Sequence, residues 1–439
     1  MNPAATLRIA IIGAGWAGMA AAVRAVQGGH RVTVFEAART LGGRARGVPL
    51  TLPDGRQLMV DNGQHILIGA YTETLRLMRL VGIDPDKALM RLPLAIRFPD
   101  GSGLRLPYWP APWDAVAGIV GAHGWPWHDK LALLGTARAW QRAGFLCDPL
   151  ASVADLCTGL PQRLMEEFID LLCLSALNTP VHEASGAVFL RVLHDGLFSQ
   201  RGGSNVLLPR VDLSALLPDA AARWIETRGA HVRIGQRVDV LHWQAPHWAV
   251  LGEPFDHVVL ATSASNAATM VSQSQSIASE LIANVLSPWS TLANRLQHRA
   301  ITTVYAQLAP DLRGRSVLAA PMIALRAGPS HPAQFVFERD AIQTDDTATG
   351  LLAFVISNSE GTREQLAAAV TQQARAQLGL AVQPLLTVIE KRATFVCTPA
   401  LQRPGRAIAP GLSACGDYVD GPYPATIEGA VRSGLSALG

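Results

Sequence analysis

The fold of this 439-residue chain is decided by the stretch RIAIIGAGWAG, residues 8–18. An apolar run typical of a buried strand leads directly into a glycine pattern, and an apolar helical pattern then continues to about Gln27. A second strand pattern at Arg31–Phe35 stops at an acidic residue, Glu36. This order predicts a strand–helix–strand unit of the Rossmann type.

Each residue of the glycine pattern has a physical task. Gly13 permits the tight turn, Gly15 lets the backbone approach a pyrophosphate, and Gly18 lets the helix lie close to the sheet. The helix pattern begins at Met19, just after Trp16 and Ala17 of the glycine element, and the free N–H groups and dipole at the helix N-terminus favour phosphate charge. Glu36 follows Gly13 by 23 positions, where a carboxylate can accept a hydrogen bond from a ribose hydroxyl. Together these features predict a dinucleotide site rather than a glycine-rich turn without a ligand.

The composition is that of a globular protein with a large apolar core. Hydrophobic residues make up 49% and charged residues 16% of the chain, against about 25% charged in an average soluble domain. The formal net charge is only +3 with no long basic run, which argues against nucleic acid as a partner. The cysteines form no CxxC pair and are odd in number, which argues against a metal site or disulfides and favours the cytoplasm: Cys147, Cys157, Cys173, Cys397 and Cys415.

A second glycine element, LGGRAR (residues 41–46), follows Glu36 closely. It resembles the GGR element of the flavin amine oxidase and phytoene desaturase superfamily. The resemblance implies that Gly42, Gly43 and Arg44 contact the pyrophosphate of FAD and hold the chain close to the flavin.

The C-terminal region carries a matching element. A short apolar strand pattern ends in Gly416-Asp417, and a loop rich in glycine and proline leads into a last helix near Thr426 and Ile427. Alone, such a pair before a turn is typical of an ordinary loop. The order resembles the C-terminal flavin element of the same superfamily, which implies that Asp417 accepts from the ribityl chain and that the helix N-terminus faces the flavin ring. Paired with the N-terminal elements, it predicts FAD as the cofactor.

A middle segment is expected to complete the flavin domain. Its patterns predict a helix over Leu216–Arg228, a strand over His231–His242 and a buried strand over Phe255–Thr262. The superfamily uses this layout, and the resemblance implies that the amide of Val238 meets the adenine ring. A generic strand residue is the alternative for Val238.

We therefore predict an α/β fold with a discontinuous, Rossmann-like FAD-binding domain over residues 1–70, 203–265 and 385–439. The inserts, residues 71–202 and 266–384, are expected to form a mixed α+β substrate-binding domain, as in amine oxidases.

Half of the ten tryptophans lie in an apolar segment, residues 107–140: Trp109, Trp113, Trp125, Trp127 and Trp140. Tryptophan combines an apolar body with a polar N–H, so it favours interfaces. The segment is therefore either a surface that touches a membrane or a tryptophan-rich pair of core helices. No run of about 18 apolar residues is present in the sequence, so we expect membrane contact only at the periphery.

Further motifs narrow the resemblance: DNGQHIL (residues 61–67), ALNTP (176–180) and GGSN (202–205). Together they resemble the squalene-associated FAD-dependent desaturase family over nearly the whole chain. The resemblance implies reductive dehydroxylation of hydroxysqualene to squalene in hopanoid biosynthesis. It also implies a hydrophobic triterpene as substrate and a separate electron donor, which the motifs do not identify.

Replacing an allylic hydroxyl by hydride requires a proton donor within hydrogen-bond reach of the leaving oxygen. The candidates are His65 and Asp61 of the DNGQH motif, followed by Asp195 with its neighbour His194. The alternative for Asp61 is a turn residue that bonds its own backbone. The alternative for both histidines is a packing role.

Three other functions compete. A carotenoid-type desaturase would use the same flavin elements oxidatively on a polyene. An amine oxidase would need a polar pocket, against which the apolar composition argues. A non-catalytic escort protein that binds isoprenoid groups would need no flavin, against which the complete glycine and Gly-Asp elements argue.

Overall fold

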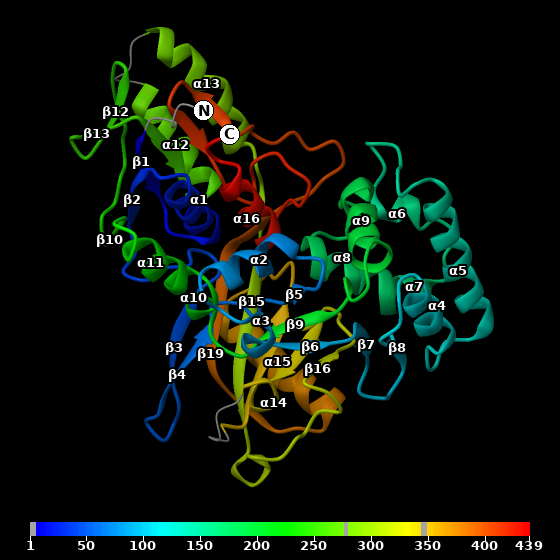
Figure 1. The fold of residues 1–439 in the computed structure, drawn as a ribbon. Helices are drawn as coiled ribbons and strands as arrows, with labels where there is room; N and C mark the ends of the chain where they lie inside the picture. The colour runs from blue at the N-terminus through cyan, green and yellow to red at the C-terminus, as the bar shows by residue number, and fades with distance from the viewer. Residues whose placement is uncertain (1–5, 276–279, 344–348) are drawn as a thin grey trace.

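The computed structural model describes residues 6–275, 280–343 and 349–439, and two large sheets organise them (Figure 1). The first sheet has six strands. From edge to edge they are β10 (His231–Ile234), β2 (Arg31–Glu36), β1 (Arg8–Ile12), β14 (His257–Leu260), β21 (Leu412–Ala414) and β20 (Ala407–Ala409). The first five are parallel, and β20 pairs antiparallel to β21. The sheet thus joins the first and last strands of the chain.

Helices cover one face of this sheet, and α1 (Trp16–Gln27) lies at their centre, buried on nearly all sides. The others are α2 (Thr72–Leu80), α3 (Pro85–Ala88), α10 (Leu213–Leu216), α11 (Pro218–Glu226) and α16 (Ile427–Leu435). Small residues let α1 and α16 touch, because a Cβ built on Gly434 would lie 2.2 Å from the carbonyl oxygen of Ala17. Figure 1 shows the two helices, blue and red, side by side.

The other face is covered by a small antiparallel sheet and two helices, which share one apolar core with Ala10 and Ile12 of β1. These elements are β11 (His242–Gln244), β12 (His247–Val250), β13 (Glu253–Phe255), α12 (Ala264–Gln275) and α13 (Glu280–Asn294).

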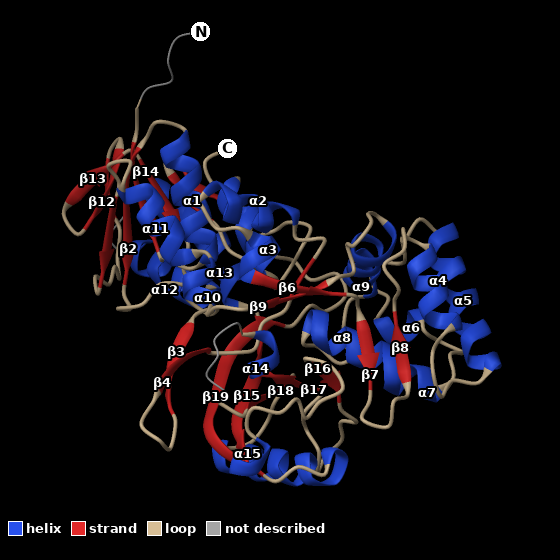
Figure 2. Ribbon diagram, turned by 60° about the horizontal axis from the view of Figure 1, so that its bottom comes forward, coloured by secondary structure: helices blue, strands red, loops and turns tan. Residues whose placement is uncertain are grey.

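The second large sheet is antiparallel, and helices cover both of its faces (Figure 2). Its strands are β16 (Met322–Ala324), β17 (Phe335–Glu338), β18 (Leu351–Ile356), β15 (His298–Leu308) and β19 (Val382–Phe395), in that order. One face packs against α15 (Arg363–Gln373) through Val304, Leu352 and their neighbours. The opposite face, with Tyr305 and Phe337, packs into a separate core formed by the α-helical insert.

The helical insert comprises α4 (Trp113–Val120), α5 (Trp127–Arg142), α6 (Val153–Leu156), α7 (Gln162–Leu164), α8 (Asp170–Leu177) and α9 (Gly186–Leu193). Short sheets connect it to the rest: β3 (Gly47–Thr51) with β4 (Gln57–Asp61), β5 (Leu67–Ile68) with β9 (Val206–Pro209) and β6 (Leu89–Leu92), and β7 (Ala95–Arg97) with β8 (Gly103–Arg105). The short helix α14 (Arg339–Ile342) follows β17.

The predicted α/β class is confirmed, and the strand–helix–strand unit lies where the glycine pattern put it. One predicted strand, His231–His242, is wrong. It divides into β10 and β11, because Gly235 turns the chain with a φ of +70°. The amide of Gln236 then bonds the carbonyl oxygen of Glu36 at 2.9 Å, which places the following residues beside the end of β2.

Packing differs from the predicted division of the chain in three places. Helix α2, expected in the substrate domain, packs in the same core as α1 and α16. Helices α12 and α13 likewise pack against the first sheet. Strand β19, most of which lies in the segment 385–439, pairs with β15 of the second sheet. Side-chain contacts across the chain fix these positions, and a linear division cannot show them.

The tryptophan-rich segment fits neither expectation alone. Trp125 and Trp140 are buried in the core of the helical insert, whereas Trp109, Trp113 and Trp127 are exposed. Among the described residues, none of the helices has the length and hydropathy needed to cross a membrane.

Candidate functional site

The glycine turn after β1 has the shape that a pyrophosphate needs. Gly13 has a φ of +109°, and a Cβ built there would lie 2.7 Å from the carbonyl oxygen of Ala261. A Cβ on Gly18 would lie 1.9 Å from the carbonyl oxygen of Gly13. Helix α1 therefore starts close against the sheet, and its first turn carries neither a side-chain cap nor an acidic residue. Its N–H groups are free to meet an anion.

Glu36 lies at the end of β2 next to this turn. One carboxylate oxygen accepts from the amide of Ala14 at 2.7 Å, and the other accepts from the amide of Ala38 at 2.8 Å. Each oxygen keeps a further lone pair, so the carboxylate can still accept from a ribose hydroxyl. Glu36, which the sequence spacing predicted at this place, therefore contacts the glycine turn directly.

The LGGRAR element folds back onto the same turn. Gly15 and Gly42 form an isolated parallel bridge, and the amide of Gly42 donates to the carbonyl of Ala14 at 3.0 Å. The indole N–H of Trp16 donates to the carbonyl of Ala45 at 3.0 Å, which secures the far side of the element. A Cβ on Gly43 would lie 3.3 Å from the Cα of Gly15. Glycines are needed because two backbones meet here without side chains between them.

Arg44 connects the two ends of the chain. Its guanidinium forms an ion pair with Asp417 and donates to the carbonyl of Ala393 at 3.0 Å. The side-chain amide of Asn62 donates to the carbonyl of Arg44 at 2.9 Å and so fixes its backbone. The predicted pyrophosphate and ribityl contacts are thus brought together across 373 residues of sequence.

The C-terminal element places a helix N-terminus beside Asp417. The amide of Ala425 donates to the carbonyl of Asp417 at 3.2 Å. Thr426 caps α16, its hydroxyl accepting from the amide of Gly429 at 2.9 Å, so that Ile427 begins the helix. Gly416 is held by a hydrogen bond from its amide to the hydroxyl of Ser433 at 3.1 Å. This arrangement points a positive helix end into the region lined by Arg44 and Asp417.

Val238 lies in the irregular segment between β10 and β11 and is buried in the same core as Phe35 of β2. Its backbone amide has no hydrogen-bond partner among the residues that the structure describes. An adenine nitrogen could accept a hydrogen bond from this N–H. The residues present therefore fit FAD from its adenine end at Val238 to its ring at α16.

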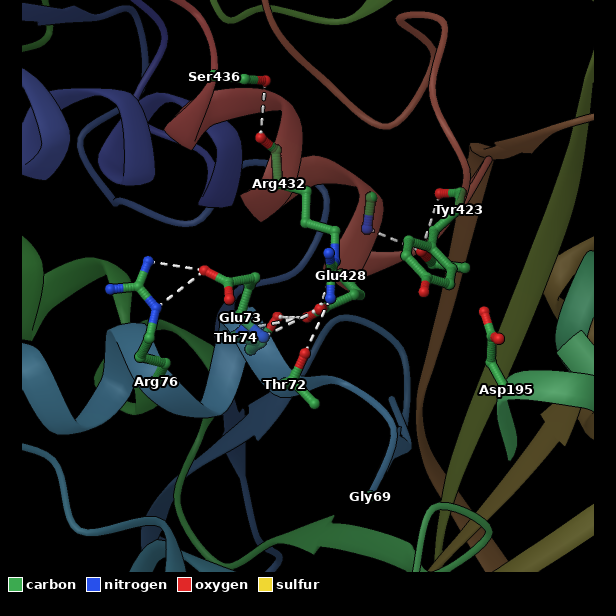
Figure 3. A network of polar contacts seen from close by, with 12 residues as sticks. Gly69, Thr72, Glu73, Thr74, Arg76, Asp195, Tyr423, Glu428, Arg432 and Ser436 are labelled. Carbon is green, nitrogen blue, oxygen red and sulfur yellow. Dashed lines mark hydrogen bonds and ion pairs between the residues drawn. The ribbon is translucent and has the colours of Figure 1, made fainter. Parts of the chain in front are cut away.

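A buried carboxylate locks α16 onto α2 (Figure 3). Glu428 is fully buried and accepts from the amides of Glu73 and Thr74 at 3.0 and 2.9 Å and from the hydroxyl of Thr74 at 2.7 Å. It also accepts from Arg432 Nε at 2.7 Å, and Arg432 Nη2 reaches the hydroxyl of Thr72 at 2.8 Å. Glu428 thus caps α2 from another helix and fixes the direction in which α16 points.

His65 lies within reach of the charge of Arg44. Its Nδ1 contacts the carbonyl oxygen of Gly63. Burial and the charge of Arg44 together hold the pKa of the imidazole below its ordinary value, although the contact with Gly63 opposes this. Because Nδ1 faces a carbonyl oxygen, the hydrogen of a neutral imidazole lies on Nδ1 and Nε2 is left as an acceptor.

Asp61 is the last residue of β4 and precedes His65 by four positions. Its Oδ1 accepts from the amide of Leu213 at 2.8 Å, and its side chain is inaccessible to solvent. Burial raises the pKa of the carboxyl to about 7, although the charge of Arg339 opposes the shift. The guanidinium of Arg339 donates to Gln64 Oε1 at 2.9 Å, and the hydroxyl of Tyr305 donates to the carbonyl of Asp61 at 2.8 Å. Asp61 is a buried, anchored group rather than a turn residue that bonds its own backbone.

Asp195 lies farther along, in the π-helical turn His194–Phe198. Its carboxylate accepts from Arg191 Nε at 2.6 Å and contacts His194 Nδ1 at 2.7 Å, and Tyr423 faces it (Figure 3). Burial alone would raise the pKa of Asp195, but these hydrogen bonds outweigh it and lower the pKa. An ionised carboxylate is an acceptor, so Asp195 positions its neighbours more readily than it donates a proton.

Two further residues near the site could not be predicted from any sequence motif. His298, at the start of β15, lies close enough to Arg44 and Asp417 to feel both charges, and burial lowers its pKa. Tyr423 lies between two guanidinium groups, with Arg432 4.9 Å and Arg191 5.5 Å from its ring centroid. A lone histidine at a strand start and a tyrosine in a proline-rich loop are too common to single out.

A turn for pyrophosphate, an acid for ribose and a C-terminal helix aimed at the same place define an FAD-dependent oxidoreductase. Residues 16–437 match the family described as flavin containing amine oxidoreductase, and the chain belongs to that family. Membership confirms FAD as the cofactor and the protein as an enzyme, which removes the flavin-free escort protein from the alternatives.

Individual relatives agree with this assignment. The hydroxysqualene dehydroxylase of Rhodopseudomonas palustris is 27% identical over 461 residues, which cover 97% of this chain and 96% of that protein. The zeta-carotene desaturase of Synechocystis sp. is 40% identical over 76 residues, 17% of this chain and 15% of that protein. An oxidoreductase from Methanosarcina mazei has a similar fold, with a TM-score of 0.72 and 16% identity over 98% of this chain and 100% of its own. The resemblance seen in the sequence is thus confirmed over nearly the whole chain.

Proposed function

We propose that this enzyme removes the hydroxyl group of hydroxysqualene reductively and releases squalene, as a step of hopanoid biosynthesis. The observation that carries the proposal is the match along 97% of the chain to a protein named hydroxysqualene dehydroxylase. The match to a carotene desaturase covers only 17% of the chain.

The reaction replaces a C–O bond by a C–H bond. The carbon takes a hydride, the oxygen takes a proton, and water leaves. Bound FAD, once reduced by an electron donor, supplies the hydride. In this proposal Gly15, Glu36, Arg44 and Asp417 bind the cofactor, and the positive end of α16 stabilises negative charge on its ring.

His65 is proposed to hydrogen-bond the departing oxygen. Its Nδ1 faces the carbonyl oxygen of Gly63 and so holds the ring hydrogen of the neutral form, which leaves Nε2 to bind a proton and pass it to the departing oxygen. Asp61 is proposed to be the source of protons in the same loop, since a carboxyl with a pKa of about 7 is partly protonated at neutral pH. Asp195 is proposed to position Tyr423 rather than to donate a proton.

The direct test supplies purified holoenzyme with hydroxysqualene in detergent micelles, without oxygen, after reduction of the flavin with dithionite. Mass spectrometry of the extract should show squalene, and the anaerobic absorption spectrum should show one equivalent of reoxidised flavin per molecule formed. The variant His65→Ala is expected to lose about 10²- to 10⁴-fold in kcat. His182→Ala, an exposed histidine outside the site, is the matched control.

Oxidative desaturation of a polyene is the second candidate. Sequence identity is 40% over the region shared with the carotene desaturase, against 27% over the match to the hydroxysqualene dehydroxylase. The two candidates differ in the direction of electron flow. If the oxidised enzyme bleaches with a polyene while the reduced enzyme leaves hydroxysqualene intact, desaturation replaces our proposal.

A further inference from the structure

Exposed apolar side chains are unevenly distributed over this protein. Among the described residues, thirteen large apolar or aromatic side chains are strongly exposed, and eight of them lie between residues 108 and 150, about a tenth of the chain. Six of the eight precede or lie on α4 and α5: Tyr108, Trp109, Trp113, Val120, Trp127 and Leu131. We call these six the aromatic face. Single exposed apolar residues are ordinary, but a concentration of this kind indicates an interaction surface.

The members of the aromatic face lie close to one another. Trp113 and Val120 are seven residues apart in α4, and Trp127 and Leu131 are four apart in α5, so each pair shares one side of its helix. Lys130 joins the pairs, because its ammonium lies 2.8 Å from the carbonyl oxygen of Val120 and 4.9 Å from the ring centroid of Trp127. Both helices stand at the side of the molecule away from the six-stranded sheet (Figures 1 and 2).

The exposed charge of this segment is mainly positive. From Arg105 to Leu150 the exposed, fully charged residues are three arginines, Arg105, Arg138 and Arg142, and one acid, Asp148. The two other acidic residues of the segment, Asp114 and Asp129, are buried. Exposed indole rings bordered by arginines match the chemistry of an anionic lipid surface, where rings settle at the headgroup level and cations meet phosphate.

A cavity adjoins the aromatic face. It has a volume of about 260 Å³ and is lined by Tyr108 and Trp109 together with Arg91, Arg201 and Asn205. Neither arginine has an ion-pair or hydrogen-bond partner among the residues that the structure describes. Asp114 also lines the cavity, and burial raises the pKa of its carboxyl, which weakens its repulsion of an anion.

The cavity is connected to the flavin site through the backbone. The loop that carries Arg201 and Asn205 precedes β9, and the carbonyl of Asn205 accepts from the amide of Gly69 at 2.9 Å. Gly69 follows His65 by four residues. A lipid held at the cavity would therefore lie at the outer end of the chain segment that leads to the proposed proton donor.

We propose that the aromatic face docks on an anionic phospholipid bilayer and that a headgroup phosphate lies between Arg91 and Arg201. The rings of Trp109, Trp113 and Trp127 enter the interfacial layer, and the exposed arginines contact neighbouring phosphates. This proposal rests on the proposed function for one point only. Hydroxysqualene dissolves in the membrane, which is the reason for the enzyme to approach it.

The test is flotation of the FAD-loaded full-length enzyme with vesicles of phosphatidylcholine alone or mixed with phosphatidylglycerol. Binding is expected only to the mixture and is expected to weaken with salt. The double variant Trp113→Ser/Trp127→Ser is expected to bind at least ~10-fold more weakly, and Met59→Ser/Ile234→Ser, exposed apolar residues elsewhere, should bind normally. Replacing Arg91 and Arg201 by glutamine should weaken vesicle binding about fivefold per arginine. The double variant Arg24→Gln/Arg31→Gln should leave vesicle binding unchanged.

Tryptophan fluorescence gives a readout that does not depend on turnover. Vesicles of brominated lipid should quench the native protein more than Trp113→Ser/Trp127→Ser. Equal binding of that variant to the mixed vesicles would overturn the proposal. So would a concentration-dependent dimer, seen by ultracentrifugation, that the same variant abolishes, since the face would then meet a second copy. Turnover in detergent micelles tests the proposed function separately, and either idea can fail without the other.

Discussion

Replacing Glu428 by alanine is expected to destabilise the protein by about 3–5 kcal/mol, and the contacts of this carboxylate give the reason. Glu428 is fully buried and accepts from two backbone amides and a hydroxyl at the start of α2. Without it the two amides and the hydroxyl of Thr74 lose their partner, and each unpaired buried donor costs about 1–3 kcal/mol. The pair with Arg432 adds less, because that side chain is about a third exposed.

The measurement is equilibrium urea unfolding at a fixed excess of FAD, since bound cofactor stabilises the folded state by mass action. Glu428→Gln keeps one acceptor oxygen and should lose roughly half as much as the alanine variant. Glu73→Gln removes a surface pair with Arg76 and should cost less than about 1 kcal/mol. If Glu428→Ala unfolds within 1 kcal/mol of the native protein, the carboxylate does not hold α2 to α16 and the reasoning fails.

Three further outcomes follow from the site. Gly18→Ala should abolish FAD binding, since its Cβ would lie 1.9 Å from a backbone oxygen. Gly135→Ala, in open space on α5, should bind FAD normally; flavin absorbance after gel filtration measures both. The pKa of Asp61 is raised to about 7 from roughly 3.9 in an unfolded chain. The folded state therefore holds the proton more tightly, and stability should fall between about pH 4 and pH 7 by at most ~1.4 kcal/mol per pH unit. Asp61→Asn should flatten this slope in urea titrations, and an unchanged slope would contradict the assignment. Asp417→Asn should weaken FAD binding by breaking the ion pair with Arg44, as equilibrium dialysis would show, whereas Asp420→Asn, at the surface, should not.

The parts of the fold that local sequence could predict are those built from local rules. The unit from β1 to β2 was predictable because glycine spacing, a run of buried residues and a terminal acid lie within 30 residues. The break after β10 was not, because a single glycine at 235 reads equally well as a strand residue until its φ is known. The same holds for helix α2, whose place against α16 depends on Glu428, more than 350 residues away.

The site divides in the same way. The residues proposed to bind the cofactor carry a motif, so Arg44 and Asp417 could each be named, but their pairing with each other could not. Asp61 and His65 could be named as candidates, while the roles that burial assigns to them depend on Leu213, Arg339 and Arg44. Solvent access and neighbouring charge set a pKa, and neither is a property of the local sequence.

The ion pair between Arg44 and Asp417 spans 373 residues, and this separation governs how the enzyme is made. A ribosome adds about 5–20 residues per second, so Arg44 waits roughly 20–75 s for Asp417. During that interval α1 has no α16 to cover its alanine-rich side, so the growing chain exposes apolar surface. A chain that stops before Asp417 and α16 lacks the partner of Arg44 and the C-terminal helix of the site. Cofactor capture is thus expected only after both parts of the site have been synthesised.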